Sequence, residues 1–284
     1  MIREWLNTYQ PKNKEEALQA LREIMQEVTL AGLSRTDFFE HAAFYGGTAL
    51  RIFYGLNRYS EDLDFSLLQI NEDFELEKYL QAIQTEFEVL GMTVSIREKD
   101  KTHKTAIESA FLKSETIWKE LVLEHMLPEI GLTERANIKI KVEVDTKPPL
   151  GFETEVKLLL RPFSFYVRCF TLSDLFAGKM HALLFRKWKN NVKGRDWYDM
   201  EWYIKKGTPL NLTHFLIRAQ ESGDWTNESI TENDIMNLLK DRIDTVDFTR
   251  VKADISRFIA DPSILDIWSP AYFHDLTSHL KVMS

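Results

Sequence analysis

Residues 44–68, FYGGTALRIFYGLNRYSEDLDFSLL, contain the most informative pattern in the sequence. The apolar run at 42–45 ends in two glycines, which predicts a buried strand that leads into a tight turn. Thr48 is the expected N-cap of a short helix, and Gly55 is expected to end that helix. Apolar and polar residues then alternate over 62–67, which is typical of a half-buried strand. We therefore predict a strand, a glycine turn, a helix and a second strand, in this order.

Two parts of this stretch indicate phosphate and metal chemistry. Gly46 and Gly47 lack a Cβ, so a ligand can approach their backbone closely, and a helix that starts at Thr48 would direct free N–H groups at an anion. Asp62 and Asp64 stand at alternate strand positions, so both carboxylates leave one face about 7 Å apart at Cα and can share Mg²⁺. Taken alone, each part also fits an ordinary helix start or a solvated pair of acids. Their connection by one short helix favours displacement at a phosphorus centre.

A third carboxylate is available further along the chain. The segment IKIKVEVD, residues 138–145, alternates apolar with charged side chains and predicts another half-buried strand. Glu143 and Asp145 lie on its charged face. If this strand pairs beside the strand at 62–67, either of the two residues can complete the metal site.

Periodicity predicts the remaining elements. From about residue 172 onward the pattern is helical, with Ser173 as the expected cap of a helix over 173–188. We therefore expect a mixed α/β domain over 1–165 and a helical domain over 166–284. Further predicted elements are helices over 14–30, 73–90, 114–126 and 196–206, at least two helices between 208 and 280, and strands over 92–97 and 105–112.

Composition excludes several classes of protein. The chain has 284 residues, of which 44% are hydrophobic and 28% charged, as in soluble globular proteins. Cys169 is the single cysteine, so we expect a buried structural thiol, no internal disulfide and a cytoplasmic location. The N-terminal segment is too polar for a secretory leader, and no apolar stretch approaches the roughly 20 residues that cross a membrane. The net charge of −8 argues against bulk coating of nucleic acid.

Three segments together resemble the motifs of the AbiEii/AbiGii toxin family of the nucleotidyltransferase superfamily, in order over about 44–204. YGGTALRIFYGLNRYSEDLDF resembles the first motif, in which Gly-Gly-Thr-Ala-Leu precedes Arg-x-Ser-x-Asp-Leu-Asp-Phe. IKVEVDTKPP, residues 140–149, resembles the second, with Glu143 at the third-carboxylate position and Asp145 as the alternative. The segment 174–204 resembles the downstream motifs, which contain Lys179 and the run Arg195-Asp196-x-x-Asp199.

The resemblance implies a nucleotidyltransferase fold, a mixed sheet with flanking helices, with a helical C-terminal domain that completes the active-site cleft. The implied reaction moves a nucleoside monophosphate from an NTP to an acceptor and releases pyrophosphate. The implied ligands of two Mg²⁺ ions are Asp62, Asp64, and Glu143 or Asp145. The implied nucleotide-binding residues are Gly46, Gly47, Thr48, Arg58, Ser60, Lys179 and Arg195. The implied catalytic residues are Asp62, Asp64, Glu143, Lys179, Asp196 and Asp199, with Asp196 or Asp199 positioning Lys179.

The family also implies a biological role and partners. Its members are toxins of type IV toxin–antitoxin systems that act in phage defence by abortive infection, so a cognate antitoxin is an implied partner. Relatives imply an RNA acceptor, with tRNA as the first candidate. Basic and aromatic residues interleave over 186–206, which predicts the RNA docking surface, although most of these rings are expected to belong to the core.

Several alternatives stay open at this point. The superfamily often has Ser in place of Thr48 and Asp in place of Glu143, and either residue type can serve. Arg58 can instead form a surface ion pair with Glu61 or Asp62, Lys179 can lie on a solvated helix face, and Arg195 and Asp199 can form a helix salt bridge. The acceptor can be a protein hydroxyl group in place of RNA. The same fold can also serve as a non-catalytic binding module.

Overall fold

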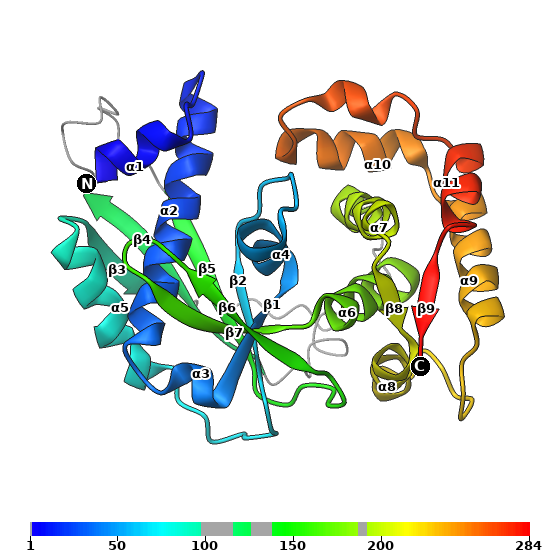
Figure 1. Ribbon diagram of the computed structural model, residues 1–284, viewed down its shortest axis with the longest axis horizontal. Helices are drawn as coiled ribbons and strands as arrows, with labels where there is room; N and C mark the ends of the chain where they lie inside the picture. The colour runs from blue at the N-terminus through cyan, green and yellow to red at the C-terminus, as the bar shows by residue number, and fades with distance from the viewer. Residues whose placement is uncertain (1, 98–115, 126–137, 187–191) are drawn as a thin grey trace. The chain divides into compact units, whose positions relative to one another are not determined.

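Figure 1 shows the computed structural model, which describes residues 2–97, 116–125, 138–186 and 192–284. The strand expected over 105–112 lies outside these residues. The chain forms two compact units, each built from separate parts of the sequence. The first unit consists of Met1–Phe53, Ser60–Pro148 and Glu155–Cys169, and the second of Tyr54–Tyr59, Pro149–Thr154 and Phe170–Ser284.

A seven-stranded sheet, in the order β3-β4-β5-β2-β1-β7-β6, organises the first unit. Its direction is mixed, because β2 pairs antiparallel with β1 but parallel with β5, and β1 pairs parallel with β7. This sheet and the helical C-terminal part confirm the predicted fold class. The strands are β1 (Ala42–Tyr45), β2 (Leu63–Leu67), β3 (Thr93–Arg97), β4 (Thr116–His125), β5 (Lys139–Asp145), β6 (Thr154–Leu159) and β7 (Phe165–Phe170).

Helices and one face of the sheet enclose the core of the first unit. Phe44, Phe65 and Val144 stand side by side on β1, β2 and β5 and are fully buried. The ring of Phe38 meets the ring of Phe65 edge-on at 4.9 Å between centroids. Gly32 of α2 lets that helix pass close to α5, because a Cβ there would lie 2.6 Å from the Cα of Ile83. The helices are α1 (Ile2–Thr8), α2 (Lys14–Ser34), α3 (Phe38–His41), α4 (Gly46–Tyr54) and α5 (Glu77–Val89).

The helix predicted over 114–126 is wrong, because this segment forms the strand β4. Its backbone pairs antiparallel with β3 on one side and with β5 on the other. Leu121 stands between Ile96 and Ile140 and is fully buried. Pairing with two distant strands therefore decides this element, and local periodicity does not contain that information.

Several helix boundaries also differ from the predicted ones. α4 begins at Gly46, so Thr48 lies within its first turn and is not the N-cap. α6 begins at Leu172 with Thr171 as its N-cap, in place of Ser173, and the Thr171 hydroxyl donates to Asp174 at 2.6 Å. These segments pass from a strand into a helix with little or no loop, so composition marks the type of element better than its first residue.

The second unit is helical. α7 buries Trp197, Met200 and Tyr203 on one side, and the ring of Tyr203 stacks on Phe176 of α6 at 4.3 Å between centroids. Gly207 ends α7 in the left-handed conformation, with φ of 71°. The helices are α6 (Leu172–Phe185), α7 (Gly194–Lys206), α8 (Leu212–Glu221), α9 (Glu232–Thr245), α10 (Phe248–Ile255) and α11 (Pro270–Thr277), with the short parallel strands β8 (Pro209–Asn211) and β9 (Lys281–Met283). In the part of the chain that the structure describes, no helix has the length and apolar character needed to cross a membrane.

Candidate active site

The parallel pairing of β2 with β5 brings two of the predicted carboxylates together. Asp64 is the register neighbour of Glu143, whereas Asp145 is the neighbour of Ser66. Residues paired in register share a face, so Asp64 and Glu143 lie on the face opposite to the buried Phe65. Asp62 immediately precedes β2 and is two residues from Asp64 along the chain. The strand register thus brings Glu143, and not Asp145, beside Asp64.

The first glycine of α4 is required by the carboxylate of Asp64. Gly46 has a φ of 83°, a conformation that side chains other than glycine rarely adopt. A Cβ at this position would overlap the Oδ2 atom of Asp64. The carboxylate of Asp64 therefore packs directly against the N-terminus of α4. A glycine at the start of the helix, because it has no Cβ, leaves room for the carboxylate to come this close.

Hydrogen bonds fix the loop that carries Asp62. Thr48 is fully buried, and its hydroxyl donates to the main-chain carbonyl of Asp62. The side-chain amide of Gln26 on α2 donates to the carbonyl of Ser60 at 3.1 Å. The hydroxyl of Thr48 thus positions an acidic loop. The backbone N–H groups in the first turn of a helix such as α4 have no acceptor within the helix, so they can bind an anion.

The carboxylates offer the oxygen donors that Mg²⁺ prefers. Glu143 forms an ion pair with Lys141, which precedes it by two residues on β5. Asp145 instead accepts a hydrogen bond from the backbone N–H of Lys147 at 3.1 Å, which ties it to the turn after β5. Among the described residues, no three acidic, histidine or cysteine side chains already converge as a metal site. The carboxylate oxygens on this face, and the close contact of the Asp64 carboxylate with Gly46, nevertheless fit the binding of a divalent cation.

Within the second unit, a buried ion pair joins two of the predicted residues. Arg58 donates through Nε and Nη2 to the two carboxylate oxygens of Asp199, each at 2.6 Å. Burial alone would lower the pKa of Arg58 and raise that of Asp199, but their mutual attraction outweighs it, so the pKa of Arg58 is raised and that of Asp199 is lowered. Both side chains are almost completely buried. The alternative of a surface pair between Arg58 and Glu61 or Asp62 is therefore wrong.

Lys179 of α6 is held by the same buried carboxylate. Its Nζ lies 2.8 Å from Asp199 and 3.8 Å from Asp196, both on α7. The side chain of Lys179 is 19% exposed, so it does not lie on a solvated helix face. The structure thus brings together Arg58, Lys179, Asp196 and Asp199 in the second unit.

Further cations gather near the start of α7. Burial lowers the pKa of Lys193, and the neighbouring charges of Arg186, Arg195 and Lys179 lower it further, against the opposing effect of Asp196. The guanidinium of Arg195 lies over the ring of Phe258, 4.3 Å from its centroid. Lys187 and Lys189, also part of the predicted docking segment, lie outside the described residues, as does Trp188.

Most of the aromatic rings in this segment serve the core, as expected. Trp197, Tyr198 and Tyr203 are buried, and the hydroxyl of Tyr198 donates to the carbonyl of Asn57 at 2.9 Å. Cys169 is a buried free thiol, as expected, and burial raises its pKa. The residue that sequence reasoning missed is Lys141, although the alternation of the strand at 138–145 already placed it on the face of Glu143.

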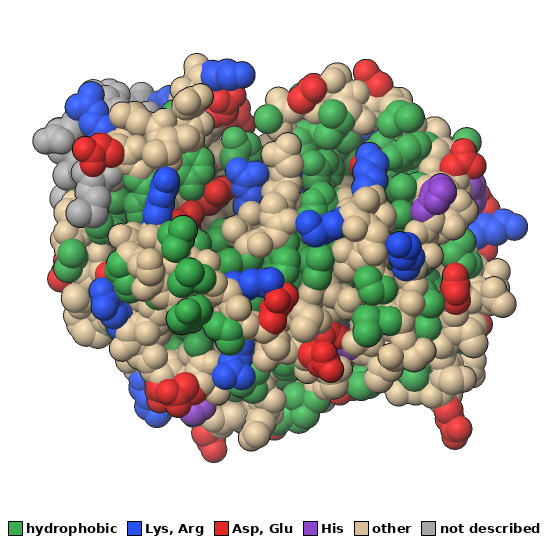
Figure 2. Space-filling view, viewed as in Figure 1, with side chains coloured by type: hydrophobic (Ala, Val, Ile, Leu, Met, Phe, Trp, Pro, Cys, Tyr) green, Lys and Arg blue, Asp and Glu red, His purple; other side chains and the backbone are tan. Residues whose placement is uncertain are grey.

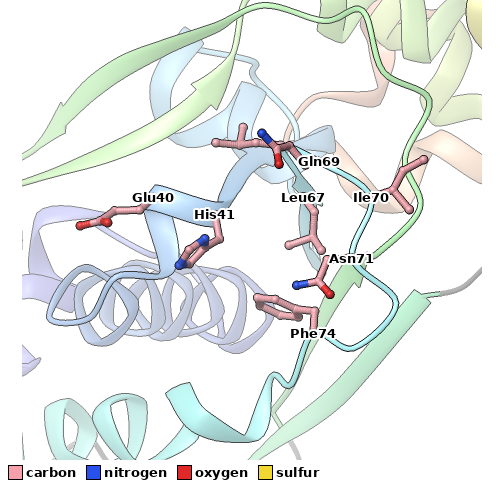
Figure 3. A pocket seen from close by; sticks show the side chains of 8 residues that line it. Glu40, His41, Leu67, Gln69, Ile70, Asn71 and Phe74 are labelled. Carbon is pink, nitrogen blue, oxygen red and sulfur yellow. The ribbon is translucent and has the colours of Figure 1, made fainter.

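A separate hollow of about 350 Å³ lies at the far end of β2 from Asp64 (Figure 3). Figure 3 shows the side chains of Leu67, Asn71 and Phe74 around it, with His41 on the opposite side. The backbone N–H of Asn71 donates to the carbonyl of Thr146, which fixes one wall. This hollow is not part of the carboxylate face.

Comparison with known proteins identifies the family. The family model described as nucleotidyl transferase AbiEii toxin, type IV TA system, matches residues 28–270. The chain belongs to the AbiEii family. It is therefore a nucleotidyltransferase toxin of the type IV toxin–antitoxin class, a family that implies an NTP substrate and an antitoxin partner. No curated protein matches this AbiEii chain.

Two solved structures share the fold of this AbiEii protein. MenT4, a nucleotidyltransferase toxin from Mycobacterium tuberculosis H37Rv, is 16% identical and has a TM-score of 0.56, over 100% of this chain and 91% of that one. JHP933 from Helicobacter pylori is also 16% identical and has a TM-score of 0.51, over 92% of this chain and 90% of that one. At such low identity, the likeness shows the fold alone.

The close contact between the Asp64 carboxylate and the start of α4 predicts the effect of replacing Gly46 with alanine. Gly46→Ala should destabilise the protein by about 1 kcal/mol through its positive φ, and should also push the Asp64 carboxylate aside. A displacement of roughly 1 Å at a reacting centre costs about a hundredfold in rate, so transfer activity should fall by about that factor. Thermal denaturation and a labelled-NTP transfer assay measure the two effects.

Gly55→Ala is the matched control for this variant. Gly55 has a similar φ of 80°, but a Cβ there would meet no atom of the described structure within 4 Å. This control should lose similar stability and keep the wild-type transfer rate. Equal activity in the two variants would show that the contact between Gly46 and Asp64 does not matter for the reaction.

Proposed function

We propose that this AbiEii protein transfers a nucleoside monophosphate from an NTP to an RNA acceptor in a Mg²⁺-dependent reaction, with tRNA as the first candidate. The observation that carries the proposal is the pairing of Asp64 with Glu143 on one sheet face, directly over the glycine start of α4. Carboxylates beside a phosphate-binding turn supply what phosphoryl chemistry needs, which is positioning and charge neutralisation. The family supports the reaction class.

Asp62, Asp64 and Glu143 would hold the metal ions. Glu143 is preferred over Asp145 because it is the register neighbour of Asp64, whereas Asp145 is bonded to the turn after its strand. When bound, two Mg²⁺ ions supply activation of the acceptor hydroxyl and neutralisation of the triphosphate. The hydrogen bond from Thr48 to the Asp62 carbonyl would keep the first ligand in place during the reaction.

The remaining predicted residues divide into phosphate contacts and positioning residues. Backbone N–H groups of Gly46, Gly47 and Thr48 would bind phosphate oxygens at the start of α4. Lys179 would contact the nucleotide as a point charge, oriented by Asp199 and Asp196. Arg58 is almost completely buried and would act through Asp199. The main-chain carbonyl of Ser60, which accepts a hydrogen bond from Gln26, would hold the loop before Asp62 in place. Arg195 would add positive charge near α7.

The acceptor proposal rests on the distribution of charge. Figure 2 shows lysine and arginine side chains interspersed with acidic ones over the face in view, and the net charge is −8. A polyanion therefore needs a local excess of positive charge. The charges of Arg186 and Arg195 reach Lys193 and lower its pKa. These three cations outnumber the two nearby acids, Asp196 and Asp254, of which Asp254 accepts a hydrogen bond from the backbone N–H of Gly194 at 2.8 Å. We propose that this group, called the α7 cation group, receives the RNA backbone.

The cellular role follows from the family. We propose that the toxin acts in the cytoplasm as part of an abortive-infection response to phage, and that its cognate antitoxin counteracts it. A single cysteine, held as a buried thiol, is compatible with a reducing compartment.

A labelled-nucleotide experiment tests the proposed function. The purified toxin is incubated with each of four α-labelled NTPs, Mg²⁺, and either total RNA or total protein from a bacterial lysate. We expect label in small RNA, loss of all label with EDTA, and no transfer by a folded Asp64→Asn variant. Label in protein alone would favour a protein hydroxyl as acceptor. Full activity of Asp64→Asn would overturn the metal-ligand assignment.

The RNA docking surface has its own test. Arg186→Gln with Lys193→Gln should weaken RNA binding and reduce the dependence of log K on log salt by about 0.7–0.9 per lost phosphate contact. The control variant removes two exposed lysines of the first unit, Lys12→Gln with Lys14→Gln, and changes net charge equally. RNA binding curves over a salt series measure both slopes. If the two double variants behave alike, the α7 cation group does not bind RNA.

A further inference from the structure

The third carboxylate of the candidate metal site already has a cation beside it. Lys141 and Glu143 stand at alternate positions on β5, so their side chains leave the same face of the sheet, and the Lys141 ammonium forms an ion pair with Oε1 of Glu143. The pair is partly exposed, with 37% of the Lys141 side chain and 27% of the Glu143 side chain accessible. It is therefore neither a core salt bridge nor a freely solvated one.

The strand register places this ammonium among the acids of β2. Leu63 is the neighbour of Val142, and Asp64 is the neighbour of Glu143. Lys141 directly precedes Val142 on β5, and Asp62 directly precedes Leu63, where β2 begins. The face thus carries Asp64 on β2, with Asp62 just before that strand, and Lys141 and Glu143 on β5. Lys141 is also the register neighbour of Glu120 on β4. A lysine in such a place offsets the repulsion between neighbouring carboxylates.

We propose that Lys141 acts as the counter-cation of the metal site. Its ammonium group pairs with Glu143 until Mg²⁺ binds and displaces the ammonium group from the carboxylate. This inference rests on the proposed function, because it assumes that Asp62, Asp64 and Glu143 take the metal. Binding then exchanges one ion pair for a metal–carboxylate contact, and the Lys141 ammonium is released to solvent or to the phosphates that accompany the metal. Because the ion pair between Lys141 and Glu143 must break first, the site binds free metal more weakly. The same ion pair stabilises the acidic face when no metal is bound.

Metal titrations of the full chain test this role without an activity readout. Mn²⁺ serves as the probe, with binding followed by electron paramagnetic resonance in the absence of NTP. Lys141→Met removes the competing charge and should bind Mn²⁺ about tenfold more tightly, as expected for a unit charge a few ångströms from the site at a partly exposed surface. Lys141→Arg keeps the charge and should bind as the wild type does.

Lys139→Met is the matched control. Lys139 lies on the same strand and the same face, two residues further from Glu143, and is exposed. The more distant charge is screened by salt, so this variant should bind Mn²⁺ as the wild type does. Circular dichroism confirms that each variant is folded, and Lys141→Gln provides a second neutral variant if Lys141→Met does not fold.

The outcomes separate this inference from the proposed function. If the wild type binds Mn²⁺ and Asp64→Asn abolishes that binding, but neutral variants at Lys141 bind no more tightly than Lys139→Met, the counter-cation role is wrong and the metal site stands. Weaker binding by Lys141→Met would likewise overturn it and show that Lys141 orients Glu143 for the metal. If Asp64→Asn leaves Mn²⁺ binding unchanged, both proposals fail together.

Discussion

The parallel pairing of β2 with β5 fixes the geometry of the candidate active site. The same register that joins Asp64 to Glu143 also joins Phe65 to Val144 in the core. A shift by one residue would turn the acids inward and expose the apolar side chains, so burial of the core enforces the alignment of the carboxylates. Glycine at position 46 then lets Asp64 lie against the start of α4. Fold stability and site geometry are thus enforced by the same contacts.

The second unit depends on a different interaction, the buried pair between Arg58 and Asp199. The two residues are 141 positions apart in the sequence and form two hydrogen bonds. Removal of one partner from such a pair typically costs about 3–5 kcal/mol, because the other charge stays buried. Two cations, Arg58 and Lys179, meet two carboxylates, Asp196 and Asp199, so this cluster has no net charge at neutral pH. This cluster therefore contributes no excess positive charge to the proposed RNA surface.

Local sequence patterns were sufficient for some features and insufficient for others. Alternation predicted β5 and the charged face that carries Glu143. The Gly-Gly pair predicted room for a phosphate at the start of α4, which stays a prediction, and the contact between Gly46 and the Asp64 carboxylate was not foreseen. The helix expected over 114–126 was wrong, because β4 is set by pairing with two distant strands. The partner of Arg58 and the choice between Glu143 and Asp145 also depend on long-range register or packing. A single sequence carries no direct signal for such long-range contacts. The alternation of apolar and polar residues that indicates a strand, in contrast, is visible within a few positions.

We propose that acids on β2 and β5 form one metal site over the start of α4. Anomalous diffraction from crystals of the wild-type protein and of Asp64→Asn, both soaked in Mn²⁺, tests it most directly. We expect an anomalous peak bonded to carboxylate oxygens of Asp64 and Glu143 in the wild type, and no peak there in the variant. Manganese bound elsewhere, with no ligand from β2 or β5, would contradict it.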